Sequence, residues 1–171
     1  ASPRTSWWQR RATFATTETI PRWCCVRRSG KEESSIVPQD RPIPGSPQEW
    51  LARARGDLAL AGAPLPPGGF YEDLCFHSQQ AAEKALKAVY LHCGWTFRYV
   101  HDLEELITGL RQNGLPVPRA VEDAVVLTSY AIEARYPGLA EPVSDEEYRQ
   151  AIELAQTVVR WADEMIERGQ A

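Results

Sequence analysis

The chain has 171 residues, a net charge of −4 at pH 7, and 43% hydrophobic residues. This length allows one domain with a sizeable core. The absence of an 18-residue apolar run argues against a transmembrane helix, and no signal-peptide pattern is visible, so we expect a cytoplasmic protein. Its four cysteines are too few and too unevenly placed for a disulfide framework, and we expect reduced thiols.

The first 45 residues differ in composition from the rest of the chain. Residues 1–31 carry seven basic side chains and three tryptophans against the single acid Glu18, and a Pro-rich stretch follows. Because no helical or strand period is visible, we predict that residues 1–45 are a disordered leader. An alternative start codon read as Val37 would remove it from the native protein. A basic arm for nucleic acid is the alternative interpretation.

The chain after residue 31 is distinctly acidic. Residues 32–171 contain 12 basic and 22 acidic side chains, which gives a net charge of −10. A protein that holds nucleic acid mainly through its phosphates needs a basic patch. Any contact with RNA is therefore expected to be local, or to be supplied by a partner chain.

The first predicted helix begins at Ser46 and ends at about Ala63. Ser46 and Glu49 form a capping box, and Pro47 occupies the first helical position. The buried stripe of this helix is expected to contain Trp50, Leu51, Ala54, Leu58 and Ala61.

The second predicted helix, from Phe70 to Cys93, is the one around which the rest of the chain is expected to pack. Its apolar side chains cover an arc of roughly 160°, which indicates contact with at least two neighbouring helices. We interpret the opposite arc as a solvated polar face, formed by Glu72, Gln79, Gln80, Glu83, Lys84 and Lys87. Phe76 and Tyr90 lie among these polar residues. Two aromatic side chains on such a face predict a homodimer interface.

Three further helices complete the prediction. The third runs from Leu103 to Gln112 with Asp102 as its N-cap, and the fourth runs from about Arg119 to Arg135. The fourth should bury Val121, Ala124, Val125, Thr128, Ala131, Ile132 and Tyr136. A capping box of Ser144 and Glu147 opens the last helix, whose buried face comprises Tyr148, Ala151, Ile152, Ala155, Val158, Val159, Ala162, Met165 and Ile166. The predicted fold is therefore all-α, an antiparallel helical bundle of four to five helices over residues 46–169.

Arg135 and His101 are the residues whose chemistry invites two interpretations. Arg135 projects from the middle of the buried arc of its helix, where it can bind terminal carbonyls and a carboxylate, or can clamp a phosphate with its planar guanidinium. His101 precedes a helix, where it can serve local hydrogen bonding or general acid–base chemistry. His77 and His92 lack a ligand-spaced partner on their helix, so we predict no metal site.

Three segments in this order resemble the HEPN family of small helical-bundle proteins: SQQAAEKALKAVYLHCGW, HDLEEL and ARYPG. The resemblance covers about residues 46–168 and implies a bundle that dimerises and is often encoded beside a minimal nucleotidyltransferase. Many members are toxins that cleave RNA with an arginine followed four to six residues later by a histidine. In this chain no arginine has a histidine at that spacing. The chain therefore resembles the branch that lacks the nuclease motif and for which nucleotide binding has been proposed.

The resemblance implies a nucleotide- or RNA-binding, regulatory component of a two-protein, toxin–antitoxin-like module, rather than an enzyme. Its expected partners are a second copy of the chain and a minimal nucleotidyltransferase, without a membrane, cofactor or metal ion. The expected ligand-binding residues are Arg135, Tyr136, His101, Asp102, Lys84 and Lys87. The alternative is a metal-independent ribonuclease toxin that uses Arg135 with His101 or Tyr136 in a rearranged site.

Overall fold

The computed structural model describes residues 42–133 and 141–168. Three consecutive short helices form one helical segment, so the described residues contain five helical segments and no strand. The predicted all-α, antiparallel helical bundle is confirmed. The elements are α1 (Pro47–Ala61), α2 (Tyr71–His92), α3 (Leu103–Gln112), α4 (Arg119–Glu122), the 3₁₀-helix η2 (Asp123–Ser129), α5 (Tyr130–Glu133) and α6 (Asp145–Arg168).

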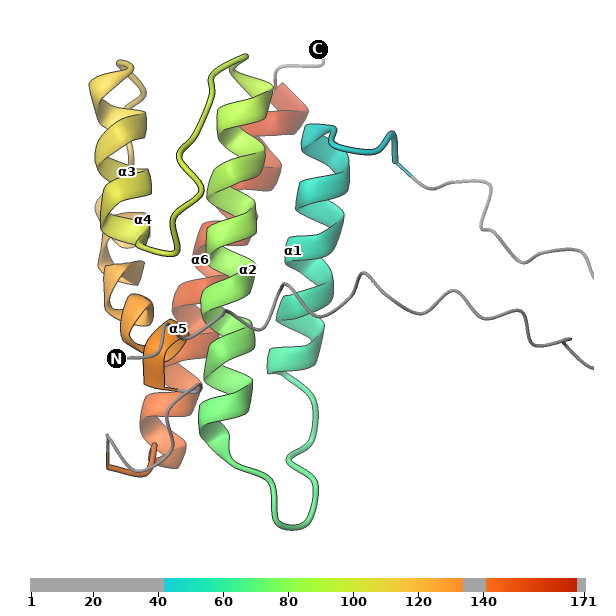
Figure 1. The fold of residues 1–171 in the computed structure, drawn as a ribbon, viewed down its shortest axis with the longest axis vertical. Helices are drawn as coiled ribbons and strands as arrows, with labels where there is room; N and C mark the ends of the chain where they lie inside the picture. The colour runs from blue at the N-terminus through green and yellow to red at the C-terminus, as the bar shows by residue number, and fades with distance from the viewer. Residues whose placement is uncertain (1–41, 134–140, 169–171) are drawn as a thin grey trace, which may run out of the picture. The chain divides into compact units, whose positions relative to one another are not determined.

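Helix α2 is the centre of the bundle (Figure 1). It packs against α1, α6, α3, α5 and η2, which confirms the prediction of at least two neighbouring helices. A series of small side chains on α2 is completely buried and allows these close approaches: Cys75, Ser78, Ala81, Ala82, Ala85 and Ala88. The wide apolar arc in the sequence therefore indicated the position of α2 correctly.

The capping box predicted at α6 is present, whereas at α1 only the bond to the Ser46 side chain is formed. At α6, Ser144 Oγ accepts a hydrogen bond from Glu147 N at 3.3 Å, and Glu147 Oε2 accepts one from Ser144 N at 2.8 Å. At α1, Ser46 Oγ accepts from Glu49 N at 3.2 Å. The Glu49 carboxylate accepts a hydrogen bond from Gly45 N at 2.6 Å, one residue before the N-cap, instead of from Ser46 N. Both helices thus begin where local capping chemistry predicts.

The prediction of one α-helix from Arg119 to Arg135 is wrong. A 3₁₀-helix, η2, occupies the middle of this segment. A 3₁₀-helix has 3.0 residues per turn, so side chains three positions apart lie on one line. The buried residues of α4 and η2 follow this spacing: Val121, Ala124 and Leu127. The α-helical period misses Leu127 and places Ile132 inside, whereas 59% of Ile132 is exposed. Arg135 and Tyr136 lie outside the described residues.

Tyr90 belongs to the core of the bundle. Only 4% of it is exposed, and its hydroxyl donates a hydrogen bond to Leu106 O at 2.7 Å. The hydroxyl fills the place that a side chain at Gly109 would take, since a Cβ there would lie 2.1 Å from Tyr90 Oη. The expectation that Tyr90 lies on a polar outer face is therefore wrong. Phe76 is partly exposed, and a dimer interface at Phe76 stays a prediction.

Within the part of the chain that the structure describes, no helix is long and apolar enough to cross a membrane.

Candidate functional site

The polar arc of α2 is largely buried, contrary to the expectation of a solvated face. Gln79 is completely buried, and Glu83 and Lys87 are each 4% exposed. These three residues are spaced by four positions and therefore form one row along α2. The expectation fails because the loop between α2 and α3 lies over this row.

The Glu83 carboxylate is the centre of a buried hydrogen-bond network. Its Oε1 accepts from Lys87 Nζ at 2.7 Å, and its Oε2 accepts from Gln79 Nε2 at 2.9 Å and lies 3.1 Å from His101 Nδ1. Burial by itself raises the pKa of Glu83, but the hydrogen bonds from Lys87, Gln79 and His101, together with the lysine charge, outweigh it. The pKa of Glu83 is consequently lower than its ordinary value, and the carboxylate is ionised at neutral pH.

The same network holds the α2–α3 loop in place. Lys87 Nζ donates to Val100 O at 3.1 Å, and Gln79 Nε2 donates to His101 O at 3.0 Å. Lys87 Nζ also lies 5.3 Å from the centre of the Phe97 ring and 5.9 Å from that of Trp50, within range of cation–π attraction. Two buried side chains of α2 therefore fix two consecutive loop carbonyls at the end of the loop.

His101 is the exposed end of the network. Its side chain is 57% exposed, whereas that of its partner Glu83 is 5% exposed. An ionised carboxylate only accepts hydrogen bonds, so Nδ1 of His101 carries the proton that faces Glu83. In the neutral ring Nε2 is then an acceptor that a ligand can reach. A buried carboxylate thus orients an accessible imidazole, an arrangement suited to proton transfer or, in the protonated ring, to binding an anion.

Asp102, next to His101, is committed to helix capping. Its Oδ1 accepts from Glu104 N at 2.8 Å and from Glu105 N at 3.4 Å, which confirms it as the N-cap of α3. The following amide, Leu103 N, donates to Thr128 Oγ1 at 3.2 Å and connects this point to η2. Asp102 therefore fixes the start of α3 beside His101.

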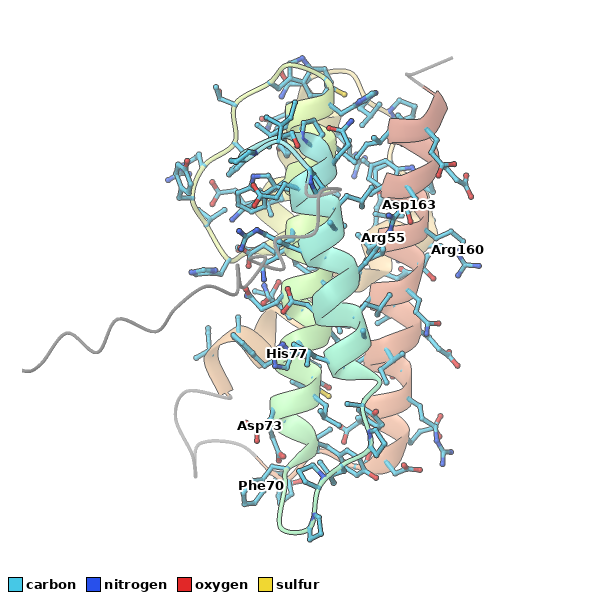
Figure 2. All side chains as sticks on the ribbon, turned by 90° about the vertical axis from the view of Figure 1, so that its right-hand side faces the viewer. Arg55, Phe70, Asp73, His77, Arg160 and Asp163 are labelled. Atoms are coloured by element: carbon cyan, nitrogen blue, oxygen red, sulfur yellow. The ribbon has the colours of Figure 1, made fainter. Side chains whose placement is uncertain are left out.

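Lys84 belongs to a second polar cluster, between α1 and α2. It forms an ion pair with Asp57 Oδ2, and His77 Nδ1 lies 3.1 Å from Asp57 Oδ1. The His77 side chain extends from α2 beside α1 (Figure 2). Both carboxylates, Asp57 and Glu83, thus bind one lysine and one histidine each. The structure brings Lys87 and His101 together and places Lys84 in another cluster.

Sequence reasoning missed Glu83, Gln79 and Asp57 as site residues. The spacing of Gln79, Glu83 and Lys87 was a detectable signal, but the same spacing is common in exposed helical ion pairs. Among the described residues, no group of three or more His, Cys, Asp or Glu side chains could hold a metal ion.

Comparisons with known proteins place this bundle among its relatives. A model of the HEPN domain matches residues 47–165. The crystal structure of TT1696 from Thermus thermophilus shares 31% sequence identity at a TM-score of 0.59, and covers 70% of this chain and 97% of its own. The crystal structure of ST0689, an archaeal HEPN homologue, shares 26% identity at a TM-score of 0.57, and covers 71% of this chain and 98% of its own. A search of curated proteins found no match.

Proposed function

Because the chain belongs to the HEPN domain family, we propose that it is the nucleotide- or RNA-binding, regulatory component of a two-protein module. The other component would be a minimal nucleotidyltransferase, in a toxin–antitoxin-like pair. One observation carries the binding role: the buried Glu83 carboxylate holds the exposed His101 imidazole in a fixed orientation. A ligand group that reaches Nε2 meets a partner whose position is already set, which lowers the entropy cost of binding.

The ligand chemistry follows from the charges in this network. The Lys87 ammonium already pairs with Glu83 and two aromatic rings, so it stabilises the site rather than offering a free cation. A protonated His101 can bind one phosphate oxygen. Arg135, which lies outside the described residues, would supply a permanent positive charge through its guanidinium. A single phosphate group, rather than a long nucleic acid backbone, suits an acidic chain with so few cations.

Binding is favoured over cleavage because RNA hydrolysis needs both a proton acceptor and a proton donor at the scissile phosphate. His101 offers one such group, and the neighbouring Asp102 carboxylate is occupied by the amides of α3. The sequence also contains no arginine followed four to six residues later by a histidine. We therefore propose a binding protein in preference to a ribonuclease.

The test is a calorimetric titration of the full-length protein with ATP, with GTP and with a short single-stranded RNA. His101→Ala should weaken binding about tenfold, because one charge-assisted hydrogen bond contributes roughly 1.5 kcal/mol. Arg135→Ala should weaken it similarly. His77→Ala is the matched control, since His77 also faces a carboxylate but lies in the other cluster. Equal effects of His101→Ala and His77→Ala would refute the assignment of the site.

A cleavage assay on the same RNA distinguishes the proposed binding protein from the alternative, a ribonuclease. The native protein should show no turnover above a buffer control in the presence of EDTA. Metal-independent cleavage that both Arg135→Ala and His101→Ala abolish, with the fold intact by circular dichroism, would make the protein a ribonuclease instead.

Two further experiments address the module itself. We expect a neighbouring gene to encode a minimal nucleotidyltransferase, and that protein should copurify with the native chain in a defined ratio. Sedimentation should show a homodimer that Phe76→Glu dissociates, because a carboxylate buried at an interface lacks a partner. A monomer at tens of micromolar, unchanged by this substitution, would end the dimer proposal.

A further inference from the structure

The turn between α1 and α2 exposes an apolar surface at one end of the bundle. Residues 58–71 contain no charged side chain. Within this stretch Leu60 is 52%, Leu65 37% and Phe70 66% exposed. We call the exposed leucines, prolines and phenylalanine of the end of α1 and this turn the α1–α2 surface: Leu60, Pro64, Leu65, Pro66, Pro67 and Phe70. Exposed apolar side chains gathered around one turn mark an interaction site more often than a single scattered leucine does.

This surface is ordered before any partner arrives. Gly69 N donates to Pro66 O at 2.9 Å, and the proline ring packs so closely that a Cβ on Gly69 would lie 3.0 Å from it. Gly68 adopts a φ of +77°, which other residues rarely reach. At the start of the turn, Ala61 O accepts a hydrogen bond from Tyr148 Oη at 2.9 Å. Because the turn is already fixed, docking a partner there costs little conformational entropy.

The start of α6 lies beside the same end of α2. The rings of Tyr71 and Tyr148 stack with centroids 4.7 Å apart, and Tyr71 Oη donates to Asp145 Oδ1 at 3.2 Å. Glu72 Oε1 accepts from Val143 N at 2.9 Å. These contacts bring the acidic residues that open α6 next to the acidic residues that open α2.

Acidic side chains consequently border the α1–α2 surface. Figure 2 shows Asp73 one turn after Phe70 on α2, at the same end of the bundle. Asp73, Asp145 and Glu146 are exposed, and no lysine or arginine occurs between residues 58 and 83. The nearest cation along α6, Arg149, is already paired with Asp145. Among the residues that the structure describes, the border therefore carries a net negative charge.

We propose that the α1–α2 surface is a docking site for a protein segment whose apolar side chains are flanked by lysine or arginine. Leu65 and Phe70 would contact the apolar side chains, and Asp73 and Glu146 would face the basic ones. The charge of the border argues against the other occupants. A second copy of the chain would bring two acidic borders together, and an anionic lipid surface would be repelled.

The test uses a fluorescent amphipathic peptide of leucine and lysine, and a matched peptide in which glutamate replaces lysine, with the full-length protein. The lysine peptide should bind, and its affinity should fall as salt rises because the border charges are screened. The double substitution Leu65→Ser and Phe70→Ser should weaken binding on the order of tenfold. The matched control is Val126→Ser with Ile132→Ser, since these residues are 61% and 59% exposed on another element. This control should change the affinity less than about twofold.

Three results would overturn the proposal. The first is equal binding of the glutamate peptide, and the second is an equal loss of affinity in the Val126 and Ile132 control. The third is a homodimer in sedimentation that Phe70→Ser dissociates, which would make the surface a contact between copies. These outcomes do not depend on nucleotide binding at His101, so the docking surface and the proposed function can fail separately.

Discussion

Replacement of Lys87 by methionine tests whether the Glu83 network holds the bundle together. Methionine keeps most of the apolar stem of lysine and removes its charge, so Glu83 would stay buried without its main counter-ion. Removing one partner of a buried ion pair costs about 3 to 5 kcal/mol. Gln79 and His101 still donate to Glu83 in this variant, and we therefore expect a loss near the lower limit, about 3 kcal/mol.

The chain offers a matched control for this substitution. Glu49 and Arg53 form an ion pair with the same spacing of four residues, but the Arg53 side chain is 65% exposed, whereas that of Lys87 is 5% exposed. Exposed pairs of this kind contribute roughly 0.3 to 0.5 kcal/mol. Arg53→Met should therefore destabilise the protein several times less than Lys87→Met does, although both substitutions break an ion pair of identical spacing.

Urea denaturation, monitored by circular dichroism, measures the stability of both variants. With an m-value of about 1.5 to 2 kcal/mol/M, Lys87→Met should lower the midpoint by roughly 1.5 to 2 M, and Arg53→Met by less than about 0.4 M. The double variant Glu83→Leu with Lys87→Met should be more stable than Lys87→Met alone, because it removes the unpaired buried charge. If Lys87→Met and Arg53→Met lower the midpoint equally, the reasoning from burial is refuted.

Three further predictions concern the pH dependence of stability, one close contact and the N-terminal residues. First, the pKa of Glu83 lies below its ordinary value of 4.5, so its contribution to stability is present at neutral pH and is lost as the pH falls through that lowered pKa. Lys87→Met should raise this pKa, and the difference in stability between native protein and variant should shrink from pH 7 to pH 4; a constant difference would contradict this. Second, Gly109→Ala should destabilise the native protein, since its Cβ would meet Tyr90 Oη. In a Tyr90→Phe background it should instead stabilise by up to about 1 kcal/mol, the helix propensity difference, and a loss in both backgrounds would argue against the predicted clash. Third, we propose that deletion of residues 1–41 leaves the thermal midpoint unchanged, and a clear decrease would assign these residues a structural role.

The elements that sequence analysis predicted correctly are those that local chemistry determines. Asp102 caps α3 and the Ser144–Glu147 box opens α6, because each cap depends on residues within one helical turn. Helix α6 shows its buried face clearly, since Ala155, Val158 and Ala162 recur at the helical period and are completely buried. Such features need no knowledge of the neighbouring helices.

The segment from Arg119 to Glu133 shows where a local reading fails. Its sequence is compatible with an α-helix, and nothing in a single turn distinguishes 3.6 from 3.0 residues per turn. The tighter 3₁₀ geometry of η2 aligns Ala124 and Leu127 with Val121. Contacts of η2 with α2, α3 and α6 accompany this geometry. The choice between the two helix types therefore depends on tertiary packing that the pattern of apolar residues does not reveal.

The site on α2 was hidden for a related reason. A helical wheel shows which residues share a face, but it does not show whether a distant loop covers that face. Glu49 with Arg53 and Glu83 with Lys87 have the same spacing, yet one pair is exposed and the other is buried. The difference arises from the α2–α3 loop, in which Phe97 packs near Lys87 and Val100 O accepts its hydrogen bond. A buried ion pair seldom stabilises a protein more than apolar residues of similar size would. What this pair adds, which apolar residues could not, is a fixed hydrogen-bond acceptor for His101 and a fixed donor for Val100 O.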